Sequence, residues 1–189
     1  ARLLHSSSAI GVQLDSLADV ITSGLAPAAV LWQVCLQTEP CWLPETWKLG
    51  YGVFVLAAFS ALRLAKFNID ETQTVEFCGL PTPAGSLLCA SLGMLWQQGA
   101  VALSSDGVLL IAVLTSLLLV SPIRMFALKF HGFGWRGNEV RYLFLLASIV
   151  LIIILRTYAI PVIIVLYIVV SAVRWLCMRS GNPDKAPKA

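Results

Sequence analysis

Residues 11–32, GVQLDSLADVITSGLAPAAVLW, combine an apolar stretch of membrane-spanning length with two carboxylates near its start. Asp15 and Asp19 are four residues apart, so on a helix they project from the same face. Two ionised carboxylates in this arrangement repel each other and are costly to keep charged beside hydrocarbon. The pair therefore calls for a cation such as Arg, a shared proton or a divalent metal, and carboxylate oxygens suit Mg²⁺ or Mn²⁺.

A purely structural role for the pair is the alternative. Negative charge near the start of a helix complements the helix dipole, and Ser6–Ser8 and Gly11 form a loop-like stretch just before it. Asp19, however, lies more than one turn inside the predicted span, where capping does not need it. We favour a functional interpretation, because ionisable residues within membrane segments generally serve a function.

The composition places this helix in a membrane protein. Hydrophobic residues make up 58% of the 189 residues and charged residues 12%, whereas soluble domains carry about a quarter charged residues. The basic residues are not gathered into one stripe, so we expect a lipid bilayer and no nucleic acid as partner. Five scattered cysteines lack the spacing of a disulfide framework or zinc site, and His5 and His131 lack the spacing of a ligand pair.

Six apolar stretches are long enough to predict membrane spans, and the expected fold is an all-α, polytopic transmembrane helix bundle. The fifth stretch is short, and only RTYAIP separates it from the sixth, so these two could instead form one kinked hairpin. Gly85, Gly93 and Gly99 in the third stretch predict close helix packing. The bundle would occupy residues 1–178, followed by a polar cytoplasmic tail at 179–189. The predicted spans are Asp15–Leu36, Trp47–Phe67, Thr82–Leu103, Gly107–Leu128, Tyr142–Thr157 and Ala159–Cys177.

The distribution of Lys and Arg predicts the orientation. If the Arg2 end is cytoplasmic, eleven of the 13 basic residues fall on the cytoplasmic side and only Lys48 and Arg156 on the other. We therefore expect the end that holds Asp15 and Asp19 to face the cytoplasm.

The spacing around the acidic pair resembles a known signature. The chain begins with A-R, then eight residues, Gly11, three residues, Asp15, three residues and Asp19. This pattern resembles the second half of the CDP-alcohol phosphatidyltransferase signature, D-x-x-D-G-x-x-A-R-x8-G-x3-D-x3-D. The stretches LDSLADVITSGLAPA, ALRLAKFNID, GLPTPAG and ALKFHGFGWRGNEVRYLF are similar to the bacterial membrane-integral phosphatidylserine synthases of that family. Two departures are Thr22-Ser23-Gly24 in place of S-F-G and Gly85 in place of Asn.

The resemblance implies an enzyme of phospholipid biosynthesis that transfers a phosphatidyl group from CDP-diacylglycerol to the hydroxyl of L-serine, giving phosphatidylserine and CMP. Asp15 would be a ligand of the divalent metal, Mg²⁺ or Mn²⁺. Asp19 would be the general base and a second metal ligand. Arg2 and Gly11 would bind the CDP-lipid, although Arg2 could also be a simple positive-inside anchor. The resemblance further implies a homodimer and an inner (cytoplasmic) membrane location.

Two residues near the end of the second predicted span, one just beyond it and one near the cytoplasmic end of the fourth are candidates for binding the acceptor or a lipid phosphate. Arg63 can hold a phosphate or the serine carboxylate with two parallel hydrogen bonds. Lys66, with Asn68 close by, could share this role or be a cation that reaches the membrane surface. Arg124 could bind an anionic head group or be an anchor of the same kind. The segment Gly79–Gly85 predicts a rigid loop that shapes the acceptor pocket or simply breaks the helix.

The first half of the signature, D-x-x-D-G, would precede Ala1. We therefore expect the chain to be a fragment that lacks about two spans and is inactive alone. The motif does not determine the acceptor, so transfer to glycerol phosphate or inositol phosphate remains an alternative. A proton-coupled transporter that uses Asp15 and Asp19 as relay groups, or a non-catalytic scaffold, are alternatives from other classes.

Overall fold

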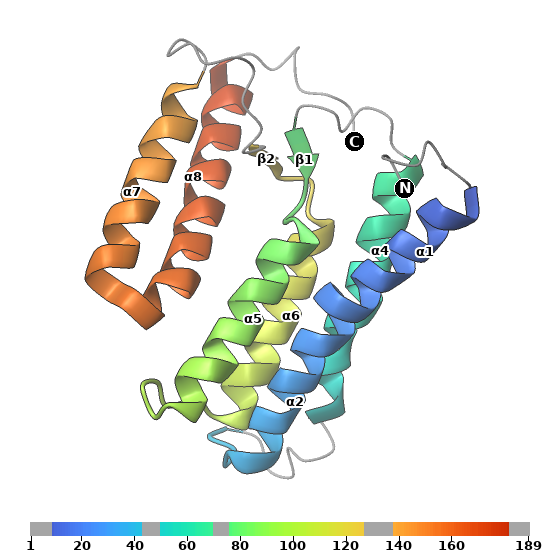
Figure 1. The fold of residues 1–189 in the computed structure, drawn as a ribbon, viewed down its shortest axis with the longest axis vertical. Coiled ribbons are helices and arrows are strands. Elements are labelled where there is room, and N and C mark those ends of the chain that lie inside the picture. Colours follow the sequence, from blue (N-terminus) through green and yellow to red (C-terminus); the bar gives the residue numbers. More distant parts are fainter. Residues whose placement is uncertain (1–8, 43–49, 70–75, 127–137, 182–189) are drawn as a thin grey trace.

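The computed structural model describes residues 9–42, 50–69, 76–126 and 138–181, which form a helical bundle with one small pair of strands (Figure 1). The first helix, α1 (Ala9–Val20), continues through a π-helical segment, Ile21–Leu25, into α2 (Ala26–Gln37). The other elements are a 3-10 segment at Gly50–Phe54, α4 (Val55–Ile69), β1 (Glu76–Cys78), α5 (Thr82–Gln97), α6 (Ser105–Val120), β2 (Arg124–Phe126), α7 (Glu139–Leu155), a 3-10 turn at Arg156–Tyr158 and α8 (Ala159–Gly181). The predicted all-α bundle is confirmed, with the two short strands as an addition.

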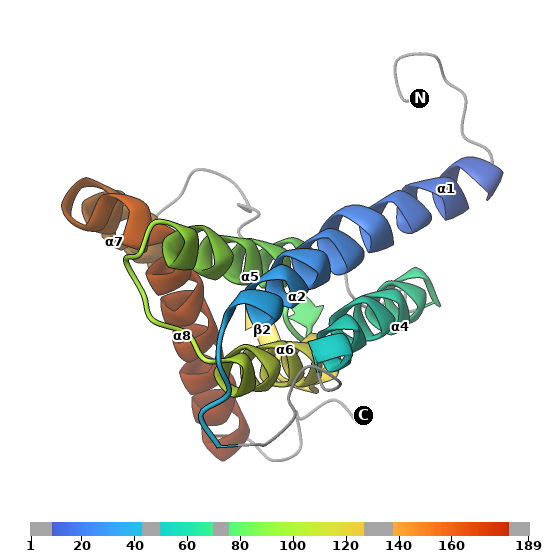
Figure 2. The same cartoon turned by 90° about the horizontal axis from the view of Figure 1, so that it is seen from below.

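Successive helices alternate in direction. As a result, α1 begins, α4 ends, α5 begins and α8 ends at one end of the bundle, and β1 and β2 lie there too (Figure 1). We call this the strand end. The turns after α2, α5 and α7 lie at the opposite end. Seen from that end in Figure 2, α7 and α8 flank α5 on one side of the bundle, and α4 lies on the other side.

Three continuous helical stretches have the length and composition of a membrane span: Gln13–Gln37, Gly50–Ile69 and Glu139–Met178. The last is 40 residues long and bends back at Arg156, whose φ of 48° breaks the helix, so α7 and α8 form the kinked hairpin considered above. The apolar helix at Ser105–Val120 is shorter. The chain is therefore a membrane protein, and the number of six spans stays a prediction.

The third and fourth predicted spans end earlier than expected. The third stops at Gln97, so its 16 residues are about 24 Å long. The fourth stops at Val120 instead of Leu128, because Ser121 precedes a proline and adopts the extended conformation with ψ of 150°. Arg124 consequently lies on a strand and not on the helix where it was predicted. At the other terminus, α8 continues to Gly181, and the proposed tail beyond it stays a prediction.

Small residues set the distances between the central helices. A Cβ on Gly93 would collide with the side chain of Val30, so α5 and α2 can approach this closely only with glycine there. A Cβ on Gly85 would lie 3.2 Å from Thr115 Cγ2 on α6. The prediction was wrong for Gly99, which follows α5 with φ of +69° and has nothing within 4 Å of an added Cβ. That residue forms a turn.

The two strands close the strand end of the bundle. They pair antiparallel, with Glu76 opposite Phe126, Phe77 opposite Met125 and Cys78 opposite Arg124. Beyond the ladder, the Gly79 N–H donates to the Ile123 carbonyl at 2.9 Å, and the Leu80 N–H donates to the Leu118 carbonyl at 2.9 Å. The GLPTPAG segment therefore enters α5 as a fixed connection, as its two prolines predicted.

Hydrogen bonds also join the helices at the opposite end. Ser105, at the start of α6, donates through its hydroxyl to the Thr38 carbonyl at 2.6 Å. The Asp106 carboxylate accepts from the backbone N–H groups of Cys41 and Trp42, both at 2.7 Å. Asp106 is 5% exposed, so it anchors the segment after α2 to α6 from within the protein.

Candidate functional site

Asp15 and Asp19 lie on α1, one turn apart and both exposed. Immediately after them the helix widens into the π-helical segment, where the Ala26 N–H donates to the Ile21 carbonyl. Segments of this kind are rare and occur often at functional sites. The Thr22 hydroxyl satisfies part of this irregular backbone by donating to the Ala18 carbonyl at 2.9 Å.

Arg63 on α4 is a buried cation and a candidate partner for this acidic pair. Only 8% of the residue is exposed, and it interacts electrostatically with Asp19 across the α1–α4 boundary. Burying an unpaired guanidinium is costly, so attraction to a carboxylate offsets part of that cost. An arginine was one of the three ways of compensating the acidic pair that the sequence left open.

Two aromatic rings and one hydroxyl hold the Arg63 guanidinium. Its Cζ lies 5.3 Å from the ring centre of Phe67 and 5.9 Å from that of Phe77, which are cation–π distances. Its Nη1 donates to the Thr82 Oγ1 at 3.2 Å, whereas its Nε has no hydrogen-bond partner among the described residues. The guanidinium therefore keeps donor capacity for an anionic group.

The other predicted site residues lie at different places relative to the acidic pair. Asn68 donates through Nδ2 to the Ser16 hydroxyl at 2.9 Å, so it joins the end of α4 to the acidic helix. Lys66 is exposed in the last turn of α4, where a positive charge also complements the helix dipole. Gly11 is exposed near the start of α1, and Arg124 is exposed on β2. Arg2, His5 and His131 lie outside the described residues.

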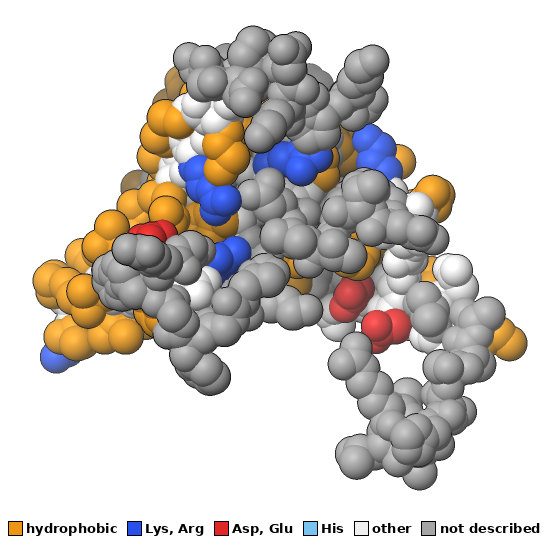
Figure 3. All heavy atoms as spheres, turned by 90° about the horizontal axis from the view of Figure 1, so that it is seen from above, with side chains coloured by type: hydrophobic (Ala, Val, Ile, Leu, Met, Phe, Trp, Pro, Cys, Tyr) orange, Lys and Arg blue, Asp and Glu red, His pale blue; other side chains and the backbone are white. Residues whose placement is uncertain are grey.

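Basic side chains lie over this end of the bundle, beside acidic side chains in separate positions (Figure 3). Among the described residues, Arg156 occupies the turn at the opposite end. The basic residues with described side chains on elements that reach the strand end are Arg63, Lys66, Arg124, Arg141 and Arg174. The predicted bias of Lys and Arg towards one side is therefore present in the three-dimensional arrangement.

Sequence reasoning missed four residues around Arg63. Thr82 was part of the GLPTPAG segment, but nothing in that segment indicated an arginine partner. No role in the site was predicted for Phe67 or Phe77. Tyr167 on α8, more than 100 residues further along the sequence, reaches this region through its hydrogen bond to the Phe126 carbonyl on β2. The one available signal was a tyrosine within an apolar helix, because a buried hydroxyl generally needs a partner.

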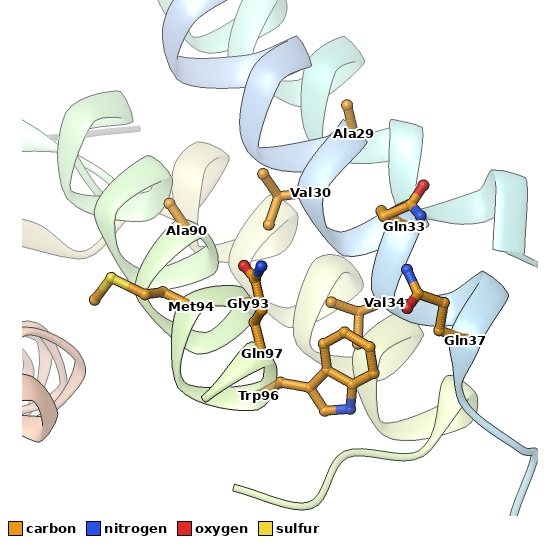
Figure 4. Close-up of a pocket in the computed structure, with 10 residues that line it drawn as sticks. All are labelled: Ala29, Val30, Gln33, Val34, Gln37, Ala90, Gly93, Met94, Trp96 and Gln97. Atoms are coloured by element: carbon orange, nitrogen blue, oxygen red, sulfur yellow. The ribbon is translucent and has the colours of Figure 1, made fainter. Parts of the chain in front are cut away.

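A groove of about 630 Å³ lies elsewhere, between α2 and α5 towards the opposite end (Figure 4). Its wall combines apolar side chains with three glutamines. None of the predicted site residues lines it. The lining residues are Ala29, Val30, Gln33, Val34, Gln37, Ala90, Gly93, Met94, Trp96 and Gln97.

The donor set at the acidic pair suits a hard divalent ion in part. Within the described ranges, no group of three or more His, Cys, Asp or Glu side chains is close enough to hold a metal. Asp15 and Asp19 contribute two carboxylates. Mg²⁺ is commonly bound by one or two carboxylates, substrate phosphates and waters, so the residues present fit such an ion as part of its ligand set.

Comparison with known proteins gives a consistent result. Residues 1–126 match the family model described as CDP-alcohol phosphatidyltransferase. A CDP-diacylglycerol–serine O-phosphatidyltransferase from Mycobacterium leprae is 40% identical over 135 residues, which cover 66% of this chain and 42% of that protein. Proteins of the same name from Bacillus subtilis and Mycobacterium tuberculosis are 31% identical over 132 residues and 33% identical over 205 residues. Those alignments cover 70% and 100% of this chain, and 67% and 68% of the relatives.

Proposed function

The chain belongs to the CDP-alcohol phosphatidyltransferase family, and we propose on that basis that it carries out phosphatidyl transfer from CDP-diacylglycerol to L-serine. The products would be phosphatidylserine and CMP. The names of the similar proteins support serine as the acceptor. The chain spans 42% of the M. leprae relative, so this proposal concerns the activity of a protein that contains the present chain.

The observation that carries the proposal is that buried Arg63 on α4 lies close enough to Asp19 on α1 for their charges to interact, next to a second carboxylate on the same helix face. This arrangement supplies a base and an anion-binding cation in one region. A transferase that joins an alcohol to a diphosphate ester needs both groups. A carboxylate–arginine pair alone would suit many sites, but its position after Gly11 and Asp15 matches the family signature.

In the proposed reaction Asp19 accepts the proton of the serine hydroxyl. A hydroxyl is a weak nucleophile until a base lies within hydrogen-bonding distance. The serine oxygen forms a bond to the phosphorus that carries the diacylglycerol, and the bond from that phosphorus to the bridging oxygen breaks. CMP leaves with that oxygen. Removing a base of this kind typically costs about 10²–10⁴-fold in rate.

Asp15 and Asp19 would hold a divalent metal, Mg²⁺ or Mn²⁺. A bound ion of this class neutralises charge on the diphosphate oxygens. Gly11, which has no side chain, would leave room for the CDP group near the start of α1, and Arg2 would contact the diphosphate. These roles come from the signature, residue by residue.

Arg63 would bind the anionic part of a substrate, either the serine carboxylate or a lipid phosphate. Its burial and an Nε without a hydrogen-bond partner among the described residues support this role, because an arginine in a low-dielectric site attracts anions strongly. Lys66, Asn68 and Arg124 remain candidates for the same task. Their exposed positions at the strand end would suit contact with head groups at the membrane surface.

The strand end would face the cytoplasm, and the protein would lie in the inner (cytoplasmic) membrane. The excess of Lys and Arg at this end supports that orientation. A homodimer remains a prediction from the family resemblance.

The deciding experiment is a transfer assay in membranes. The chain would be expressed with any coding sequence that precedes Ala1, then supplied with CDP-diacylglycerol, labelled L-serine and Mg²⁺ or Mn²⁺. We expect metal-dependent label in lipid that disappears in Asp19→Asn. The matched control is Glu39→Gln, which neutralises an exposed carboxylate at the opposite end. Label from glycerol phosphate but not from serine would contradict the acceptor, and no transfer to any alcohol would contradict the enzyme.

A further inference from the structure

The hairpin of α7 and α8 lies outside residues 1–126, the region matched by the family model, yet α8 packs against two elements of the candidate site. It contacts α5, which begins at Thr82, and β2. Tyr167 lies at this contact and is 7% exposed. Its ring centre is 5.0 Å from that of Phe126 and 5.8 Å from that of Phe144.

The Tyr167 hydroxyl is bonded to the backbone of β2. It donates to the Phe126 carbonyl at 2.9 Å within the protein interior. Phe126 pairs with Glu76, and its neighbour Met125 pairs with Phe77 on β1. The hydrogen bond from α8 therefore fixes the strand against which β1, and with it Phe77, is aligned.

Phe77 in turn lies within cation–π distance of the Arg63 guanidinium, as described above. The guanidinium has few other attachments among the described residues, namely the Thr82 hydroxyl and the Phe67 ring. Its orientation consequently depends on where β1 lies.

We propose that Tyr167 is a positioning residue for Arg63, acting through the hydrogen bond to Phe126 and the β1–β2 ladder, so that α8 completes the anion-binding side of the site. This inference rests on the proposed function in that Arg63 binds the anionic part of a substrate. Tyr167 does not itself touch the reacting atoms in this scheme.

The kinetic test uses Tyr167→Phe, which removes one oxygen and keeps the ring. Arg63→Lys identifies the substrate whose binding depends on this arginine. For that substrate we expect Tyr167→Phe to raise KM about threefold to tenfold, the effect of one lost hydrogen bond, with kcat nearly unchanged. The matched control is Tyr158→Phe, which removes a comparable hydroxyl bond to the Ala100 carbonyl, 3.1 Å long, at the opposite end.

A double variant separates positioning from general stabilisation. If Tyr167 acts through Arg63, then Arg63→Lys combined with Tyr167→Phe is no worse than Arg63→Lys alone, because the two changes remove one interaction chain. Losses that multiply would show that Tyr167 only stabilises the fold, and would overturn the inference.

A second readout does not require activity. Met125 on β2 is fully buried, so a cysteine placed there by Met125→Cys reacts with a maleimide only when the strand opens. In a protein with Cys41, Cys78 and Cys177 changed to Ser, we expect Tyr167→Phe to speed labelling of this buried cysteine about threefold to tenfold and Tyr158→Phe to leave it unchanged. Equal rates in both variants would overturn the inference. Faster labelling in a protein without serine transfer would instead contradict the proposed function alone.

Discussion

The Arg63 side chain donates through Nη1 to the Thr82 Oγ1 at 3.2 Å, and this bond joins the C-terminal half of α4 to the first residue of α5. Both residues are buried, with exposures of 8% and 2%. The start of α5 is thereby attached to a buried cation that interacts with Asp19. This hydrogen bond links the candidate site to the packing of α4 and α5, and mutation of Thr82 tests it.

Replacing Thr82 by Val keeps the shape and removes the acceptor. We expect lower thermal stability in detergent and a raised KM for the substrate that Arg63 binds, because a buried donor left without its partner costs about 1–3 kcal/mol. Thr115→Val is the control, since the Thr115 hydroxyl is also buried, between α5 and α6, and accepts a weak thiol contact from Cys89 at 4.0 Å. Equal effects of the two changes would contradict the role of Thr82.

Asp15→Asn and Asp19→Asn should differ in their response to metal. Asp15→Asn removes one ligand, so we expect the half-saturating concentration of Mg²⁺ or Mn²⁺ to rise about tenfold or more, with activity partly recovered at saturation. Asp19→Asn removes the proposed base, so added metal should not restore turnover. Recovery of Asp19→Asn by metal would assign Asp19 to metal binding only.

The approach of α2 and α5 should depend on Gly93. In Gly93→Ala the new methyl group meets the Val30 side chain, and overpacking of this kind costs about 1–3 kcal/mol. The unfolding midpoint in detergent should fall. It should recover in part when Val30→Ala is added, since that change removes the colliding methyl groups. No recovery in the double variant would show that the cost arises elsewhere.

Asp106→Asn should loosen the opposite end without affecting the site. The two hydrogen bonds from the backbone at Cys41 and Trp42 lose their charged acceptor, and bonds to charged groups are worth about 1.5–3 kcal/mol each. We expect faster maleimide labelling of Cys41 and an unchanged KM for serine. A raised KM would mean that the two ends are coupled.

Labelling from each side of the membrane tests the orientation. Cys78 lies at the strand end and Cys41 at the opposite end, and both thiols are exposed. In single-cysteine forms, an impermeant maleimide should reach Cys78 only in inside-out vesicles and Cys41 only in spheroplasts. The reverse pattern would place the acidic pair outside the cytoplasm.

Local sequence was informative wherever a single stretch carried the physical cause. Apolar runs predicted the helices because each run must satisfy its own backbone hydrogen bonds in lipid. The RTYAIP segment indicated the break between α7 and α8, where Arg156 has a positive φ. The spacing of Gly11, Asp15 and Asp19 identified the family through one helix face, and the family match supports that identification.

The ends of elements and the surroundings of Arg63 were not predictable in this way. Each strand is three residues long, too short for an alternating pattern. It forms only by pairing with the other strand, which is about 50 residues away in the sequence. The helix before β2 was therefore predicted to end at Leu128, whereas it ends at Val120. Gly93 packs closely and Gly99 forms a turn, although both were only small residues in one apolar stretch.

The sequence alone determined the membrane class, the positions of the helices, the excess of basic residues on one side and the acidic signature. Each of these depends on residues that are close together in the sequence. Only the folded arrangement shows that Asp19 lies near Arg63, that Thr82, Phe67 and Phe77 surround this arginine, and that Tyr167 on the last helix bonds to β2. A buried charge takes its partners from whatever packs around it, and helix packing brings together residues that are distant in the sequence.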